Sequence, residues 1–334
     1  MPFDKFGRPL RDLRVSVTDR CNFRCPYCMP AEIYGERYQF LPRNELLTFE
    51  EIKRIVGVCV ELGVKKVRLT GGEPLVRQGI EQLVGIISGI DGIEDFAMTT
   101  NAYLLTGMAR KLRDAGLQRI TVSMDSIDEG VFQHMNGRGF GTAKVMAGIE
   151  AAKEAGFDPV KINAVIQRGV NEHTIVELAS WCREHGHTPR FIEYMDVGTL
   201  NDWKLDQVLP AQEIINIIES VYPLKQVDQA YRGEVAKRYR YSDGKGEFGV
   251  ISSVTQPFCG DCTRLRLSPE GQLVTCLFSD SGVDVREPLR QGASDAELRN
   301  IISGSWEVRD DRYSEIRTSM TEPRKKVEMY HIGG

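Results

Sequence analysis

Residues 13–28 read LRVSVTDRCNFRCPYC, an apolar run that leads directly into three cysteines. The β-branched residues of Leu13–Thr18 predict a buried strand. Behind this strand, Cys21, Cys25 and Cys28 place three thiols within eight residues, so one loop can wrap them around a small inorganic centre. We therefore expect a metal-bearing loop at the carboxyl end of the first strand, where α/β enzymes build their active sites.

Apolar runs alternate with segments of helical period along the first two thirds of the chain. The expected strands are Leu13–Thr18, Lys66–Gly71, Phe96–Asn101, Ile120–Asp125, Val160–Ile166 and Arg190–Met195. The expected helices are Phe49–Leu62, Ile80–Ile90, Met108–Ala115, Thr142–Ala155 and Ile175–His185. This alternation implies right-handed crossovers and a parallel sheet. It predicts an α/β fold, a partial (β/α)6 TIM-type barrel, with an open doubly wound sheet as the alternative.

After about Ile218 the pattern changes to short strands, which predicts a small α+β C-terminal domain. These strands are Val235–Tyr241, Phe248–Val254, Thr263–Leu267 and Leu273–Phe278, with a hairpin turn at 268–271 and one helix over Ser294–Ser305. We expect domains at 1–225 and 226–308, followed by a C-terminal tail at 309–334. The highly charged stretch Arg309–Lys326 predicts an extended or mobile tail.

Composition narrows the class of protein. The chain has 334 residues, of which 41% are hydrophobic and 27% charged, and its net charge is −4. That charge argues against a nucleic-acid coat or a basic membrane patch. No secretory signal and no apolar run of roughly 20 residues is present. We expect a cytoplasmic enzyme, in which clustered cysteines stay reduced and bind metal.

The first cysteine triad lacks a fourth nearby Cys or His, which a structural zinc site normally has. Three thiolates at these intervals suit a [4Fe–4S] cluster with one open iron. The spacing Cys-x3-Cys-x2-Cys, with Tyr27 before the last cysteine, resembles the radical S-adenosylmethionine (SAM) family. That resemblance implies that SAM chelates the open iron and is cleaved to methionine and a 5′-deoxyadenosyl radical. It assigns SAM contacts to the family-matching residues Tyr27, Gly72, Ser123 and Met195.

A second triad, Cys259, Cys262 and Cys276, flanks the predicted hairpin and again lacks a nearby fourth thiol. We expect it to hold a second [4Fe–4S] cluster whose open iron can bind substrate. The remaining cysteines, Cys59 and Cys182, fall among apolar neighbours in helical segments, so we expect them to be buried small hydrophobic residues.

Basic residues lie beside the second triad and along the predicted barrel strands. In an extended strand, Arg264 and Arg266 point to the same side, where guanidinium groups can pair bidentately with phosphate. We therefore expect a polyanion such as a triphosphate. The chain has no Walker A sequence, so a nucleotide must be bound by another route.

With both triads, the chain resembles the GTP 3′,8-cyclase family of molybdenum cofactor biosynthesis. The resemblance extends from Arg14 to Cys276 and includes the terminal pair Gly333-Gly334. It implies removal of the ribose 3′ hydrogen of GTP, attack on guanine C8, and formation of (8S)-3′,8-cyclo-7,8-dihydroguanosine 5′-triphosphate. It assigns catalytic roles to Arg14, Gly333 and Gly334. It assigns GTP contacts to Arg14, Lys66, Arg68, Thr99, Lys161, Arg190, Arg264, Leu265 and Arg266.

The same resemblance implies partners beyond the GTP substrate. These are an electron donor of the flavodoxin or ferredoxin type and, downstream, cyclic pyranopterin monophosphate synthase; homodimers are common in the family. Two alternatives stay open. A peptide-modifying radical enzyme would usually carry more auxiliary cysteines. An iron–sulfur electron carrier or sensor would leave unexplained Gly71-Gly72-Glu73, which follows the second expected strand and resembles the Gly-Gly-Glu motif of the radical SAM family.

Overall fold

The computed structural model describes residues 1–229, 233–317 and 325–334. A single 12-stranded sheet runs through it, in the order β12-β11-β10-β1-β2-β3-β4-β5-β6-β9-β8-β7. The strands are β1 Asp12–Ser16, β2 Lys66–Thr70, β3 Asp95–Thr100, β4 Arg119–Ser123, β5 Lys161–Ile166, β6 Thr188–Glu193, β7 Leu224–Val227, β8 Lys237–Tyr241, β9 Glu247–Ile251, β10 Arg264–Leu267, β11 Gln272–Val274 and β12 Val283–Asp284.

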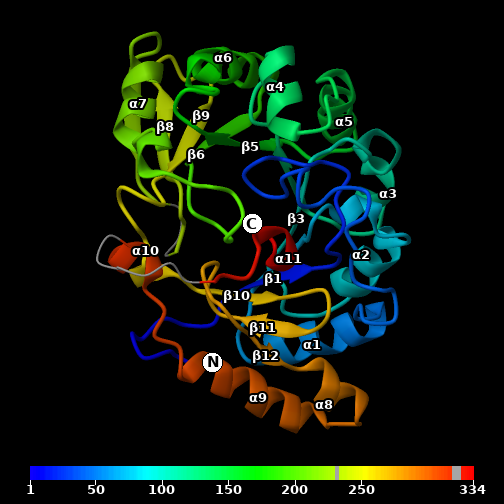
Figure 1. The fold of residues 1–334 in the computed structure, drawn as a ribbon. Coiled ribbons are helices and arrows are strands. Elements are labelled where there is room, and N and C mark those ends of the chain that lie inside the picture. The colour runs from blue at the N-terminus through cyan, green and yellow to red at the C-terminus, as the bar shows by residue number, and fades with distance from the viewer. Residues whose placement is uncertain (230–232, 318–324) are drawn as a thin grey trace.

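The helices lie mostly on the outer side of the curved sheet, but α11 (Met329–Ile332) lies on its inner side, beside β1 (Figure 1). They are α1 Phe49–Glu61, α2 Ile80–Ser88, α3 Ala109–Asp114, α4 Glu129–Asn136, α5 Ala143–Glu154, α6 Ile175–His185, α7 Ala211–Glu219, α8 Arg286–Arg290, α9 Asp295–Glu307, α10 Tyr313–Ile316 and α11 Met329–Ile332. None of the helices in the described part of the chain is long and apolar enough to cross a membrane.

Strands β1 to β6 are parallel neighbours, which confirms the α/β class and agrees with a partial barrel. Along β2, Val67 and Leu69 are buried in the core, whereas Arg68 between them is half-buried and lines cavities inside the sheet. Side chains alternate between the two faces of a strand. The apolar side of β2 therefore packs into the core, and its basic side faces the interior of the barrel.

Segments from the C-terminal third extend both edges of the six-stranded sheet. Strand β10 pairs in parallel with β1, which sets Arg266 opposite Arg14, and β9 pairs in parallel with β6. The predicted hairpin is confirmed: β10 and β11 are antiparallel, and Gly271 in the turn between them has φ +91°. Strand β7 crosses the boundary predicted after residue 225, and the division into domains stays a prediction.

The prediction of an extended or mobile tail over Arg309–Lys326 is wrong for the described residues. Arg309 is buried, α10 forms within this stretch, and Lys326 Nζ lies 2.7 Å from an oxygen of the Asp196 carboxylate. Three of the charges that suggested a solvated tail pair with carboxylates from distant segments: Arg309 with Asp4, and Arg317 and Lys326 with Asp196. Residues 318–324 of that prediction lie outside the described residues.

Candidate active site

Two cavities lie inside the barrel, and each is lined by one cysteine triad. The first-triad cavity is lined by Cys21, Cys25 and Cys28. The second-triad cavity is lined by Cys259, Cys262 and Cys276. The cavities adjoin, because both are lined by Thr99, Asn163, Ile192, Met195, Leu277 and Gly334. The two triads thus face one continuous interior.

Arg24 holds the loop of the first triad in shape. Its guanidinium donates to the carbonyls of Tyr34 at 2.5 Å and of Cys21 and Phe23, both at 2.7 Å. These bonds fix the backbone of the loop whose three cysteines line the cavity. Sequence reasoning missed this role, although an arginine inside the cysteine motif was a visible signal.

Burial makes the first-triad thiols poor acids in the protein alone. It raises the pKa of Cys21 to about 12 and also raises the pKa of Cys25 and Cys28. Thiolates are the form that binds metal. These buried sulfurs thus need a cationic centre among them to become thiolates, and binding releases protons.

Gly71 and Gly72 let the end of β2 pack against the loop that enters the first triad. A Cβ on Gly72 would lie 2.4 Å from the Arg20 carbonyl oxygen, and one on Gly71 would lie 2.6 Å from that of Thr18. Both contacts are closer than real Cβ atoms approach. Packing within the protein therefore requires both glycines at these positions.

Glu73, which sequence reasoning left without a role, joins the ends of β2 and β3. Its buried carboxylate accepts from Thr100 Oγ1 at 2.7 Å, from the Asn101 N–H at 2.7 Å and from the Leu75 N–H at 3.0 Å. Burial raises its pKa to about 7. The sequence placed Glu73 in the Gly71-Gly72-Glu73 motif, but only the fold shows which groups its buried carboxylate joins.

The four predicted SAM contacts, Tyr27, Gly72, Ser123 and Met195, all line the first-triad cavity. The Tyr27 hydroxyl donates to Asp125 Oδ2 at 2.8 Å, and Asp125 Oδ1 accepts from the Val165 N–H at 2.9 Å. This chain of contacts fixes the tyrosine ring against the cavity wall. Asp125 also lines the cavity and was not predicted.

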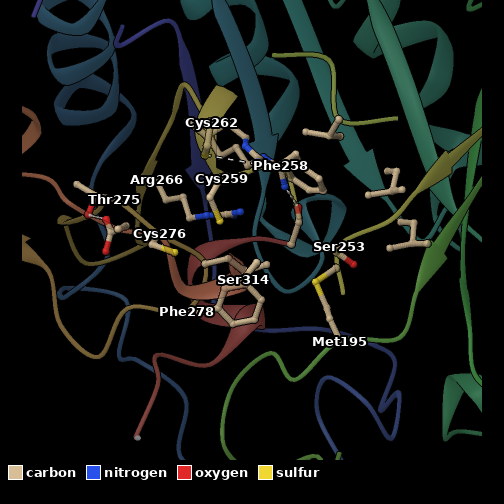
Figure 2. Close-up of a pocket in the computed structure, with 18 of the residues that line it drawn as sticks. Met195, Ser253, Phe258, Cys259, Cys262, Arg266, Thr275, Cys276, Phe278 and Ser314 are labelled. Atoms are coloured by element: carbon tan, nitrogen blue, oxygen red, sulfur yellow. Dashed lines mark hydrogen bonds between the residues drawn. The ribbon is translucent and has the colours of Figure 1, made fainter. Parts of the chain in front are cut away.

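The second triad comes from the turn before β10 and from the chain just after β11 (Figure 2). Burial raises the pKa of the Cys262 thiol, but Arg264 and Arg309 outweigh it, and the pKa falls to about 6. An Arg264 guanidinium N–H contacts Cys262 Sγ at 3.4 Å. Burial raises the pKa of Cys276 to about 12. One thiolate of this triad is therefore stabilised by the protein itself.

Six arginines line the second-triad cavity: Arg14, Arg68, Arg190, Arg264, Arg266 and Arg309. Burial and the nearby charges of Arg266, Arg264 and Arg68 lower the pKa of Arg14 well below its usual range. Arg68 donates to Thr99 Oγ1 at 3.0 Å, which orients its guanidinium inside the barrel. Such a concentration of buried positive charge favours a polyanionic ligand.

The remaining predicted GTP contacts lie near this cavity. Lys66 lines a third cavity at the amino ends of the strands, together with Arg14, Arg68, Arg190 and Arg264. Lys161 and Leu265 line none of these three cavities. Burial, followed by Arg190 and Arg119, lowers the pKa of Lys161 to about 8. The Leu265 side chain is buried in the hydrophobic core, so only its main chain remains for a contact.

Gly334, at the C-terminus marked in Figure 1, lies at the junction of the two cavities and lines both of them. The carbonyl of Gly333 accepts from Arg266, and that of Gly334 accepts from Arg14. Helix α11 holds the tail in place, because His331 Nε2 lies 2.7 Å from Glu270 Oε1 and the Tyr330 ring packs on Tyr34. Because α11 is held in this way, Gly333 and Gly334 reach Arg266 and Arg14.

The donor sets suit iron–sulfur clusters better than single ions. Each triad supplies three free thiols to a roomy cavity. Within residues 1–229, 233–317 and 325–334, no three His, Cys, Asp or Glu side chains are close enough to hold one metal ion. A cubane is larger than an ion and is bound by separated thiolates. Three ligands leave one iron of each cubane open.

Comparisons with known proteins agree with this site. Residues 15–182 match the family model described as Radical SAM superfamily, and residues 187–315 match Molybdenum Cofactor Synthesis C. A protein named GTP 3′,8-cyclase from Acidothermus cellulolyticus is 51% identical over 356 residues, covering 99% of this chain and 98% of that protein. The chain belongs to the GTP 3′,8-cyclase family. A GTP 3′,8-cyclase from Staphylococcus haemolyticus is 50% identical over 335 residues, with the same coverage.

Membership in this family confirms two [4Fe–4S] clusters and SAM as cofactors and identifies the chain as a radical SAM enzyme. Solved structures support the fold alone. Streptococcus suis SuiB superposes with a TM-score of 0.61 at 17% identity, covering 89% of this chain and 68% of that one. The protein anSMEcpe, solved with AdoMet and a peptide, superposes with a TM-score of 0.58 at 14% identity, covering 96% of this chain and 94% of that one.

Proposed function

We propose that the chain converts GTP and SAM into (8S)-3′,8-cyclo-7,8-dihydroguanosine 5′-triphosphate, 5′-deoxyadenosine and methionine, the first step of molybdenum cofactor biosynthesis. The observation that supports this most directly is the shared wall of the two triad cavities. It allows the ribose of a nucleotide in one cavity to lie beside SAM in the other. When bound, the first cluster supplies the electron that cleaves SAM.

Residues of the first-triad cavity bind and orient SAM. Cys21, Cys25 and Cys28 hold the first cluster. Tyr27, fixed by Asp125, would contact the adenine, and the Gly72 backbone would contact the methionine part. Ser123 and Met195 complete the contacts. Phe23, Val165 and Ile192 line this cavity, and their apolar side chains reduce the access of water to the reactive 5′ carbon.

Residues of the second-triad cavity bind GTP. Cys259, Cys262 and Cys276 would hold the second cluster, which would supply a binding position for the guanine. Guanidinium groups pair with phosphate oxygens in fixed geometry. The triphosphate and ribose are bound by Arg14, Lys66, Arg68, Thr99, Lys161, Arg190, Arg264, Leu265 and Arg266, with Leu265 acting through its main chain.

The tail positions the reacting groups. Gly333 and Gly334 bind Arg266 and Arg14 through their carbonyls. The tail therefore orients two guanidiniums that face the substrate and closes the junction between the two cavities. Arg14, Gly333 and Gly334 are the catalytic residues on this proposal.

Further parts of the proposal concern partners and location. We place the enzyme in the cytoplasm, as a homodimer, with a flavodoxin or ferredoxin as electron donor and cyclic pyranopterin monophosphate synthase as the next enzyme. The proposed domains are residues 1–225, which bind SAM, 226–308, which carry the second cluster, and the tail 309–334.

Anaerobic incubation of the reduced holoenzyme with SAM and GTP tests this function. We expect 5′-deoxyadenosine to form with GTP and to be reduced to background without it or with ATP in its place. The cyclised nucleotide should accumulate in equal amount. If GTP is inert while a peptide triggers SAM cleavage, the cyclase proposal is wrong and the peptide-modifying alternative is correct.

A further inference from the structure

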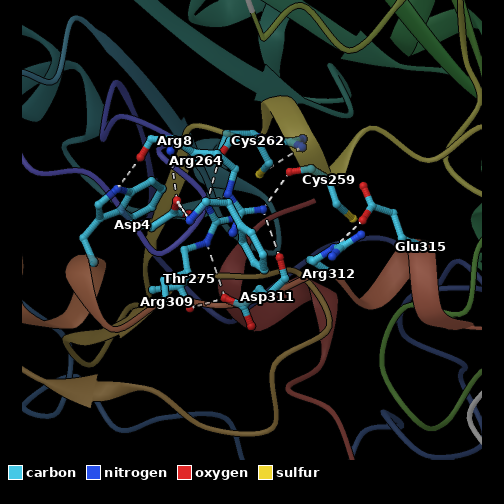
Figure 3. A network of polar contacts seen from close by, with 12 residues as sticks. Asp4, Arg8, Cys259, Cys262, Arg264, Thr275, Arg309, Asp311, Arg312 and Glu315 are labelled. Atoms are coloured by element: carbon cyan, nitrogen blue, oxygen red, sulfur yellow. Dashed lines mark hydrogen bonds and ion pairs between the residues drawn. The ribbon is translucent and has the colours of Figure 1, made fainter.

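A buried charge network joins the two ends of the chain beneath the second triad (Figure 3). Asp4 Oδ2 accepts from Arg8 Nε at 2.6 Å and from an Arg309 guanidinium N–H at 3.1 Å. The side chains of Asp4, Arg8 and Arg309 are 0%, 1% and 2% exposed. Charged groups are seldom buried this completely unless they are paired. The proposed function leaves Asp4, Arg8 and Arg309 without a role.

Local contacts hold each residue of the network in position. Asp4 Oδ1 accepts from the backbone N–H of Phe6 at 3.0 Å and of Arg8 at 2.9 Å, so the N-terminal turn is built around this carboxylate. The Arg309 guanidinium carbon lies over the Trp306 ring, 4.5 Å from its centroid. Trp306 Nε1 donates to the Arg8 carbonyl at 3.0 Å. Helix α9 and the N-terminal turn thus hold both arginines rigidly.

The two arginines extend from Asp4 to the backbone of the cluster ligands. Arg8 donates to the Cys259 carbonyl at 2.7 Å, and Arg309 donates to the Cys262 carbonyl at 2.8 Å. Arg8 also donates to the Asp311 carbonyl at 2.9 Å, while the Asp311 carboxylate accepts from Thr275 Oγ1 at 2.6 Å. Thr275 immediately precedes Cys276. Every ligand of the second triad is therefore connected to this network, directly or through one neighbour.

We infer that Asp4, Arg8 and Arg309 are positioning residues of the second cluster: they set the spacing of its three thiolates and place positive charge beside them. This inference rests on the proposed function in that Cys259, Cys262 and Cys276 must carry that cluster. Contacts behind the ligands orient metal sites, and charge near a cluster tunes its reduction potential. Positive charge favours the reduced, more negative cluster.

Substitutions that remove charges of opposite sign distinguish this role from a purely structural one. Arg309→Gln removes positive charge and should lower the midpoint potential of the second cluster. Asp4→Asn removes negative charge and should raise it. Arg309→Lys keeps the charge but loses the planar donor geometry, so the potential should stay near the unaltered value. All three should weaken iron retention against a chelator by about 10-fold or more.

The potential is measured by a redox titration followed by EPR, in full-length chains whose Cys21, Cys25 and Cys28 are replaced by Ala, so that one cluster contributes. Iron retention is measured in the holoenzyme, with circular dichroism to verify folding. Asp295→Asn and Arg299→Gln are matched controls, because their ion pairs with Arg54 and Glu61 are exposed and join α1 to α9. Neither control should alter the cluster.

Distinct results overturn the inference and the proposed function. The variant that lacks the first triad but keeps Asp4, Arg8 and Arg309 should retain about four irons per chain. If it retains none, the second cluster and this inference both fail. If iron is present but Arg309→Gln and Asp4→Asn behave like the controls, or shift the potential in the same direction, only the inference fails.

Discussion

Gly333→Ala should release the C-terminal tail from the site. Gly333 has φ +73°, and a Cβ there would lie 2.1 Å from Thr70 Cγ2. The left-handed backbone costs an alanine about 1–2 kcal/mol. Overpacking costs about 1–3 kcal/mol more. Their sum, about 2–5 kcal/mol, shifts the equilibrium between docked and released tail by a factor of about 30 or more.

The assay pairs turnover with a direct measure of docking. Cyclisation of GTP under anaerobic conditions should fall about 30-fold or more, while the iron content stays unchanged. Hydrogen exchange of the α11 amides should accelerate at the same time. The matched control is Gly292→Ala, because Gly292 has φ +90° but a Cβ there would meet no atom within 4 Å. The Gly292→Ala variant introduces an alanine at positive φ without a steric clash, so it should keep full activity.

A second substitution tests the origin of the clash. Thr70→Ser removes the Cγ2 methyl, so it should be nearly neutral alone and should restore part of the activity of Gly333→Ala. The backbone strain should remain in the double variant. Turnover of Gly333→Ala at the unaltered rate would refute the role of tail docking. A double variant no better than Gly333→Ala would refute the steric explanation.

Three further predictions concern the cavities and the tail. Cys276→Ala should keep the first cluster, about four irons per chain, and lose cyclisation; full activity would contradict a substrate role for the second triad. Because burial, Arg190 and Arg119 lower the pKa of Lys161 to about 8, its charge is present below that pH and lost above it. GTP affinity in equilibrium dialysis should therefore weaken as pH rises through about 8, by about 10-fold, and Lys161→Met should abolish that dependence. His331→Ala removes the partner of Glu270, 2.7 Å away, and should reduce turnover about 2-fold to 10-fold with iron content unchanged; unchanged turnover would show that this contact does not hold the tail.

Much of the barrel was predictable because its signals are local. The predicted helix Ile175–His185 matches α6 at both ends, since an amphipathic run is closed by Gly186 at φ +77°. The six barrel strands were located within two residues at each end. Helix α7 was missed, although Ile214, Ile215 and Ile218 repeat at helical spacing and are buried.

The pairing of the sheet edges was not predictable. Strands β9 and β10 add to opposite edges of the barrel, beside β6 and β1. Edge pairing is made by backbone N–H and C=O groups that every residue carries, so side-chain pattern does not specify the partner. The same limit applies to Asp125, because an isolated carboxylate in a sequence is indistinguishable from a surface charge.

The amino-acid sequence by itself determined the chemistry of the two triads, because ligand spacing within a loop is a local property. Cys21, Cys25 and Cys28 need only eight residues to define a three-ligand site. Only the tertiary structure decided that Gly334 lies between two adjoining cavities and that Asp4 pairs with Arg309 across 305 residues of chain. Contacts at such separation depend on how the whole sheet closes, and no local pattern records them.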